Sequence, residues 1–212
     1  MKDEKSVKLR HNEGILDLRV YYGEPNKPVL LLFHGATNDM NHPLISGLAT
    51  SMKARGWSSV RFNFGFVSGK KKPNFAEVAR EYITVLTWIK SEFKGLPVYI
   101  AGKSLGGFVC IFNAKRVKVD GIIVFGYPLI KPDGALIEQS HLSDLDAPIL
   151  FIKGIEDPYT NEGVLNKVIR EYSLNALSFW LNGVGHSMEG AELIAIEIAE
   201  ESLVNWYENE SN

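Results

Sequence analysis

The chain has 212 residues, of which 45% are hydrophobic and 23% are charged, and its formal net charge at pH 7 is −2. This composition is typical of a globular protein and argues against disorder, a coiled coil or a fibre. The balanced charge gives no general reason to expect nucleic acid or an anionic membrane surface as a partner. The length predicts one domain over residues 1–212.

The sequence also bears on the compartment. Residues 1–10 are charged and lack the apolar run of a secretory signal. The apolar runs farther along are short, whereas a membrane helix needs about 18 residues or more. Cys110 is the single cysteine, so no disulfide can form within the chain. We therefore expect a cytoplasmic protein without a membrane span, and no feature of the sequence indicates its oligomeric state.

The first half of the chain alternates strand patterns with helix patterns. Strand-like segments at 7–10 and 15–22 flank Asn12-Glu13-Gly14, which predicts a hairpin. A continuous apolar run at 29–33 then predicts a strand that is covered on both faces. The remaining expectations for this half are, in chain order, a helix from 44 that ends near 53–56, a weaker strand at 59–64, a helix over 75–93 and a strand at 98–101.

The alternation continues in the second half. The expected elements are a helix after Ser104, a strand at 121–125, a strand at 149–152, a helix over 162–172, a weaker strand at 177–181 and a helix over 191–206. The 22 residues from Gly126 to Ala147 predict a loop with room for one helical turn. This order predicts an α/β protein with a mostly parallel, doubly wound sheet and an antiparallel edge.

The strongest local signal is Gly102-Lys103-Ser104-Leu105-Gly106, which directly follows the predicted strand at 98–101 and opens a helix. In this context the pattern G-x-S-x-G predicts a nucleophile elbow, a sharp turn that exposes the serine hydroxyl at the end of the sheet. The serine backbone is strained in such a turn, so the residues two positions away must be small. The alternative is a glycine-rich turn with an inert serine.

A serine hydroxyl needs a base to remove its proton, and His186 is the candidate among five histidines. It follows the last predicted strand in a loop that contains glycine. Asp157 follows the strand at 149–152 and is the candidate acid that orients the imidazole, with Glu156 as the neighbouring alternative. For each of these residues the alternative is an ordinary loop side chain. The chain order Ser104, Asp157, His186 is that of one class of hydrolase.

Such a hydrolase needs hydrogen-bond donors for the oxyanion. The backbone N–H of Leu105, directly after the serine, is one expected donor. The second should come from the loop after the strand at 29–33, where Gly35 permits a tight turn and the N–H of Ala36 is the candidate. His34 is assigned to ordering that turn rather than to acting as a base.

Two residues are candidates for the substrate pocket. They are His34, at the start of the loop just described, and Tyr127, which follows the strand at 121–125. A packed tyrosine in a turn is an equal alternative for Tyr127. No group of histidine, cysteine and carboxylate residues has metal-ligand spacing, and no glycine loop matches a dinucleotide-binding or phosphate-binding motif. We therefore expect no cofactor and no metal ion.

Together these motifs resemble those of the α/β-hydrolases over nearly the whole chain. The resemblance is carried by His34-Gly35, Gly102 to Gly107, Gly154 to Pro158, and Gly185-His186. Within that superfamily the chain is most similar to small cap-less members of the dienelactone-hydrolase-like group. Gly-Lys-Ser-x-Gly-Gly and Gly126-Tyr127-Pro128-Leu129 resemble a subgroup that includes the testis-expressed and histone-acetyltransferase-complex hydrolase-like proteins. Dienelactone hydrolases proper use cysteine as the nucleophile, so the serine here argues against a dienelactone as substrate.

The resemblance implies an α/β-hydrolase fold without a cap domain and a site that is open to solvent. It implies a serine hydrolase that cleaves carboxylic esters or thioesters of small to medium size. Ser104, His186 and Asp157 would act through an acyl-enzyme intermediate, with a small-molecule substrate as the expected partner. Two alternatives stay open: a catalytically silent interaction module, and a peptidase or acyltransferase that uses the same three residues.

Overall fold

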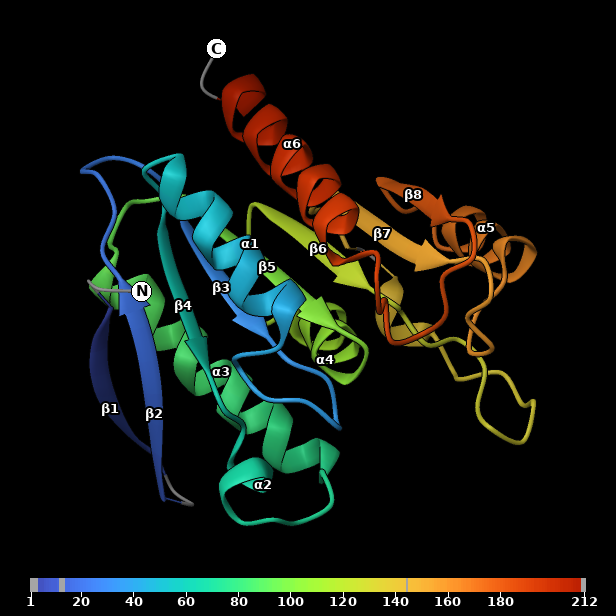
Figure 1. The fold of residues 1–212 in the computed structure, drawn as a ribbon, viewed down its shortest axis with the longest axis horizontal. Helices are drawn as coiled ribbons and strands as arrows, with labels where there is room; N and C mark the ends of the chain where they lie inside the picture. The colour runs from blue at the N-terminus through green and yellow to red at the C-terminus, as the bar shows by residue number, and fades with distance from the viewer. Residues whose placement is uncertain (1–3, 12–13, 144, 211–212) are drawn as a thin grey trace.

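The computed structural model describes residues 4–11, 14–143 and 145–210 and arranges them around one eight-stranded sheet (Figure 1). The strands lie side by side in the order β1-β2-β4-β3-β5-β6-β7-β8. Strands β3 to β8 are parallel, and β2 pairs antiparallel with both β1 and β4. Their bounds are β1 Lys5–His11, β2 Gly14–Tyr21, β3 Val29–Phe33, β4 Ser58–Phe62, β5 Val98–Lys103, β6 Gly121–Phe125, β7 Ile149–Gly154 and β8 Ala176–Leu181.

The predicted antiparallel edge is formed by β1 and β2. Their register runs from Lys5 opposite Val20 to His11 opposite Gly14. The turn expected at Asn12-Glu13 lies outside the described residues.

Helices cover both faces of the sheet. In Figure 1, α1 and α6 lie on the near face, and α3 and α4 lie on the far face. Buried side chains of α1 and α6 pack with one set of strand residues, and those of α3, α4 and α5 pack with the opposite set. The helices are α1 Pro43–Ala54, α2 Gly65–Ser68, α3 Phe75–Glu92, α4 Leu105–Asn113, α5 Glu162–Glu171 and α6 Glu192–Glu210.

The continuous apolar runs are explained by these two layers. Every residue of β3 is fully buried, with Leu30 and Leu32 packed toward α1 and α6 and with Leu31 and Phe33 packed toward the other layer. A strand whose faces are both covered has no polar side to alternate with its apolar side. The doubly wound sheet predicted from the run pattern is therefore confirmed.

Two local differences from the predicted elements occur after β4. The strand ends at Phe62, two residues earlier than the extended pattern indicated, because the chain leaves the sheet there. The Phe64 N–H donates to Nε2 of His34 at 3.1 Å instead of pairing with a strand. The short helix α2 follows at Gly65–Ser68, and its four residues are too few to show a helical period in the sequence.

The described residues between β6 and β7, 126–143 and 145–148, form no cap domain, as predicted. They hold one 3₁₀ turn at Ser140–Leu142 and one isolated bridge between Ile130 and Leu136. Among the described residues, no helix has the length and apolar character needed to cross a membrane. The assignment of residues 1–212 to one domain stays a prediction.

Candidate active site

Ser104 lies at the sharp turn between β5 and α4. Its φ is 50° and its ψ is −113°, a strained backbone conformation for a residue with a side chain. The turn is closely packed on both sides. A β-carbon on Gly102 would lie 2.5 Å from the backbone nitrogen of Gly107, and one on Gly106 would lie 2.6 Å from the carbonyl oxygen of Phe33. Only glycine fits at these two positions, so the turn has the form of a nucleophile elbow.

A continuous chain of hydrogen bonds starts at this serine. Ser104 Oγ lies 2.9 Å from Nε2 of His186, and Nδ1 of His186 lies 2.9 Å from Oδ2 of Asp157. Because an ionised carboxylate only accepts hydrogen bonds, we assign the imidazole proton to Nδ1. Nε2 is then free to accept the serine proton. Glu156, the neighbouring alternative, is exposed.

Asp157 is buried and has a second partner, Lys153, on the same oxygen atom. Lys153 Nζ lies 2.6 Å from Oδ2 of Asp157, and both side chains are fully buried. Burial alone raises the pKa of Asp157. Hydrogen bonds from His186 and Lys153, together with the charge of Lys153, outweigh burial and lower that pKa to about 2. Asp157 is therefore ionised at neutral pH.

For Lys153, in contrast, burial is the dominant influence on the pKa. Burial lowers its pKa to about 8, although the negative charge of Asp157 opposes the shift. Its Nζ also donates to the carbonyl oxygen of Tyr127 at 2.8 Å. The Lys153 ammonium is thus paired inside the protein with the Asp157 carboxylate and the Tyr127 carbonyl oxygen.

The loop after β3 approaches the nucleophile closely. A β-carbon on Gly35 would lie 3.6 Å from Cβ of Ser104. Ala36 lines the same cavity as Ser104, and Leu105 is the first residue of α4. Ala36 is thus next to a residue whose backbone approaches the serine, and Leu105 directly follows the serine in the chain.

His34 is not a pocket residue, which corrects the expectation from the sequence. It is fully buried, its Nδ1–H donates to the carbonyl oxygen of Gly35 at 2.8 Å, and its Nε2 accepts from Phe64 N–H. Its ring also contacts the rings of Phe64 and Phe66. Burial lowers the pKa of His34, which keeps the ring neutral. It therefore ties the loop after β3 to the turn after β4.

Tyr127 is also not a pocket residue, because its side chain is fully buried away from the cavity. Its hydroxyl lies 3.0 Å from both Oε1 of Gln139 and Nε2 of His141. Its carbonyl oxygen accepts from Lys153 and from Thr160. The packed-tyrosine alternative describes this residue, and its neighbour Pro128 lines the cavity instead.

The cavity beside Ser104 has a volume of about 330 Å³. Part of its lining is the loop at 35–38, and part comes from the segment between β6 and β7. Tyr159 also lines it, with its ring edge-on to the imidazole of His186 at a centroid distance of 4.7 Å. The lining residues outside the loop at 35–38 are Lys103, Ser104, Pro128, Ile130, Lys131, Pro132, Ile137, Tyr159 and His186.

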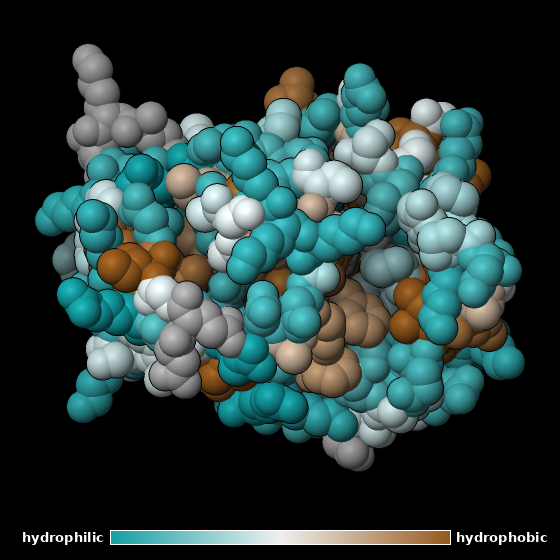
Figure 2. Space-filling model, turned by 90° about the horizontal axis from the view of Figure 1, so that it is seen from below, coloured by the Kyte–Doolittle hydropathy of each residue, from teal (hydrophilic) through white to brown (hydrophobic). Residues whose placement is uncertain are grey.

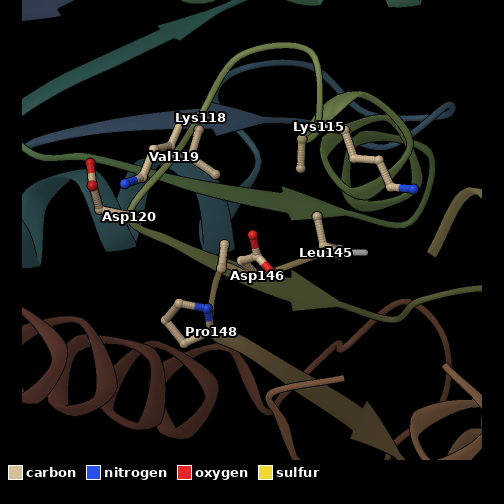
Figure 3. Close-up of a pocket in the computed structure, with 9 residues that line it drawn as sticks. Lys115, Lys118, Val119, Asp120, Leu145, Asp146 and Pro148 are labelled. Carbon is tan, nitrogen blue, oxygen red and sulfur yellow. The ribbon is translucent and has the colours of Figure 1, made fainter. Parts of the chain in front are cut away.

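Another cavity, of about 520 Å³, lies at the opposite end of the strands (Figure 3). It is lined by the charged residues Lys115, Lys118, Asp120 and Asp146 together with small and apolar residues. Its lining includes no serine, histidine or cysteine, so we place the candidate site at Ser104. In the described part of the chain, no group of three or more histidine, cysteine or carboxylate residues could hold a metal ion.

Comparison with known proteins identifies the family. A family model described as an alpha/beta hydrolase domain matches residues 26–199. The chain belongs to the alpha/beta hydrolase family. A curated relative of this α/β hydrolase is "Putative esterase YheT" of Escherichia coli (strain K12), which is 29% identical over 115 residues. That match covers 50% of this chain and 33% of the relative, so the chain spans about a third of the relative's length.

Solved α/β hydrolases share the architecture over nearly their full length. An α-β serine hydrolase homologue from Coxiella burnetii has a TM-score of 0.80 at 20% identity, covering 95% of this chain and 98% of that one. An α/β serine hydrolase without a lid from Xanthomonas campestris has a TM-score of 0.79 at 17% identity, with coverages of 97% and 96%. Dienelactone hydrolase from Anabaena variabilis has a TM-score of 0.78 at 18% identity, with coverages of 94% and 95%.

These comparisons confirm the predicted superfamily and fold, with a dienelactone hydrolase among the structural neighbours. The narrower resemblance to the testis-expressed and histone-acetyltransferase-complex hydrolase-like subgroup stays a prediction.

Three parts of this α/β-hydrolase site were missed in the sequence. Lys153 had a usable signal, since a lysine in a continuous buried strand is an unexpected charge that needs a partner. Tyr159 follows Asp157 by two residues, and nothing in its spacing points to His186. The wall formed by Ile130 and Ile137 depends on how the segment between β6 and β7 folds back, which no local pattern encodes.

Proposed function

We propose that this α/β hydrolase is a serine hydrolase that cleaves carboxylic esters or thioesters of small to medium size. The observation that carries the proposal is the chain of hydrogen bonds from Ser104 through His186 to Asp157 at the edge of a cavity. An isolated serine or histidine is common on a protein surface. A serine on a strained elbow that is bonded to a histidine, which is bonded in turn to a buried carboxylate, is an arrangement suited to nucleophilic catalysis.

In the proposed mechanism, Nε2 of His186 takes the proton of Ser104 as Oγ attacks the carbonyl carbon. The backbone N–H groups of Ala36 and Leu105 stabilise the negative oxygen of the tetrahedral intermediate. His186 then donates its proton to the leaving alcohol or thiol, and the acyl group stays on Ser104. His186 next removes a proton from water, and the water oxygen bonds to the acyl carbon. The bond from the acyl carbon to Ser104 Oγ then breaks, the acid leaves, and His186 returns the proton to Oγ. Asp157 orients the imidazole throughout.

The cavity supports an acyl group of modest size. Its volume of about 330 Å³ is at the lower end of the range for small-molecule sites. The wall from Pro128, Ile130 and Ile137 is apolar and suits a hydrocarbon portion. Figure 2 views the molecule from below Figure 1 and shows a mainly hydrophilic surface on which hydrophobic residues lie in separate areas. On the face that this view shows, the hydrophobic areas are separate, so this face offers no large continuous apolar patch for a lipid surface.

The first test compares the wild type with Ser104→Ala on a panel of p-nitrophenyl esters and thioesters of increasing acyl length. We expect the variant to lose kcat by about 10³-fold or more, because the nucleophile is removed while its partners remain. Circular dichroism and thermal unfolding should stay close to those of the wild type. Full activity of purified Ser104→Ala would contradict the mechanism.

Labelling with a fluorophosphonate separates the enzyme from a catalytically silent interaction module. We expect wild-type protein to be labelled at Ser104 and Ser104→Ala not to be labelled. Folded wild-type protein that resists labelling near neutral pH would favour the interaction module. Turnover of peptides or acyl transfer to an amine in the same assays, without ester hydrolysis, would favour a peptidase or acyltransferase.

The proposal also includes the membership of the narrower subgroup, a cytoplasmic location and a mechanism that needs no cofactor. Backbone N–H groups and side chains supply every step above, so acyl transfer requires no further group.

A further inference from the structure

The carboxylate of Asp157 accepts hydrogen bonds from two side chains on one oxygen. Oδ2 lies 2.6 Å from Nζ of Lys153 and 2.9 Å from Nδ1 of His186, while Oδ1 accepts from the Tyr159 N–H at 2.9 Å. The carboxylate is therefore held at both oxygens. The proposed mechanism uses Asp157 and His186 but has no role for Lys153.

The position of Lys153 makes its charge effective. It lies in β7 with no exposed surface, and water does not screen the ion pair with Asp157. The two distances to Oδ2 place Nζ within about 5.5 Å of Nδ1 of His186, which is the sum of the two separations. At that distance a positive charge opposes a second positive charge on the imidazole.

We propose that Lys153 is a positioning residue that anchors Asp157 and whose positive charge makes His186 harder to protonate. The inference rests on the proposed serine-hydrolase function. In the resting enzyme His186 must be unprotonated at Nε2 to accept the serine proton. A buried cation behind Asp157 keeps the histidine in that form at lower pH than the carboxylate alone would allow.

Other titratable groups surround this unit. Lys103 of β5 interacts electrostatically with Asp157. Lys131, in the segment between β6 and β7, lines the cavity. Tyr159 contacts the ring of His186, and Glu156, next to Asp157, is exposed. His141 lies behind Tyr127. Among the described residues, Lys153 is the cation bonded directly to the carboxylate that His186 contacts.

The test measures the rate of fluorophosphonate labelling, and kcat/KM on the best ester, from pH 4 to pH 10 for the wild type and Lys153→Met. Methionine keeps an unbranched apolar stem of similar length and removes the charge. We expect the acid limb of both profiles, the pH range in which the rate falls as pH is lowered, to move to higher pH by about one unit in the variant. The reason is that repulsion between two like charges at this distance shifts proton binding by that order. A purely structural role would lower the rates without moving the limb.

Two further variants keep the result interpretable. Lys153→Gln retains a donor without charge and should move the limb in the same direction, which separates charge from hydrogen bonding. Lys167→Met makes the same substitution at an exposed position of α5 and should leave the limb in place. Thermal unfolding sets a temperature at which every variant is folded.

The outcomes separate this inference from the proposed function. No labelling of the wild type at any pH would overturn the serine hydrolase. Labelling of the wild type and both Lys153 variants, with acid limbs that coincide, would overturn the role of Lys153 and leave the hydrolase intact. If Lys153→Met is unfolded, coincidence of the Lys153→Gln and wild-type limbs has the same meaning.

Discussion

Among single residues, the candidate site depends most on the hydrogen-bond and ion-pair partners of the buried Asp157 carboxylate. Asp157 follows a strand and has no exposed side-chain surface, so its charge depends on Lys153, His186 and the Tyr159 N–H. A buried charge without such partners would be costly. The same contacts that orient the imidazole therefore also keep Asp157 ionised.

This arrangement predicts a specific loss of stability in acid. The pKa of Asp157 in the folded protein is about 2, below the ordinary value of 3.8 for an aspartate side chain. A carboxyl whose pKa is lowered by folding contributes stability that is present above the unfolded pKa and is lost as pH falls through the folded pKa. The contribution should disappear between about pH 4 and pH 2.

The measurement compares the wild type with the double variant Lys153→Met/Asp157→Asn, which removes both buried charges and leaves neither alone. Urea unfolding is measured at pH 7, 4 and 2. The unfolding free energy of the wild type minus that of the double variant should decrease between pH 4 and pH 2. Other carboxyl groups are common to both proteins and cancel in that difference. A difference that stays constant down to pH 2 would show that Asp157 is not held ionised by folding.

At the scale of elements, the elbow depends on contact between β5, α4 and the end of β3. Gly106 lies in the first turn of α4, and a β-carbon on it would clash with the backbone of Phe33 and His34. The motif could be recognised in the sequence because its glycines are local to the serine. The strand they press against is about 70 residues earlier in the chain, and only the pairing of β3 with β5 brings it there.

Gly106→Ala should therefore destabilise the protein by about 1–3 kcal/mol, the usual cost of forcing an added atom into packed backbone. Gly163→Ala in α5 is the matched control. A β-carbon there would lie 3.5 Å from Oδ1 of Asn161, an ordinary contact, and alanine is the better helix former. Its unfolding free energy should be unchanged or raised. Equal stability of the two variants would mean that the elbow is loosely packed.

The segment between β6 and β7 shows where local patterns were insufficient. Its shortness correctly predicted the absence of a cap domain. The site open to solvent that the resemblance implied stays a prediction. The segment also contributes Ile130 and Ile137 to the lining of the cavity beside Ser104, which the sequence pattern did not indicate. The Ile130–Leu136 bridge that folds the segment back has no strong signal in the sequence.

Across the whole molecule, two separate apolar layers cover the opposite faces of one sheet. The layer on the near face in Figure 1 is formed with α1 and α6, and α6 lies across β6 and β7 and beside α1. Leu203 of α6 is fully buried in this layer, whereas Leu193 of the same helix is 79% exposed. The helix therefore contributes through one face.

Leu203→Ala should lower the unfolding free energy by about 2–5 kcal/mol, since it opens a cavity in that layer. Leu193→Ala should change it by no more than about 0.5 kcal/mol. Chemical denaturation of both variants tests this, with the ester assay below the unfolding transition as a check on the site. Comparable losses from the two substitutions would contradict the packing of α6.

The amino-acid sequence alone predicted the alternation of buried strands and helices, the glycine turn around Ser104 and the chain order of Ser104, Asp157 and His186. These features are local, because each has a sequence pattern that spans only a few residues. The patterns are a continuous apolar run for a strand covered on both faces, glycines at a tight turn, and polar residues in a loop after a strand. Only the folded structure shows that the side chains of His34 and Tyr127 are buried and that Ile130 and Ile137 line the cavity. It also shows that Lys153 and His186 share Oδ2 of Asp157. These depend on which distant segments meet, and side-chain contacts across a sheet are set by strand order and register rather than by neighbouring residues.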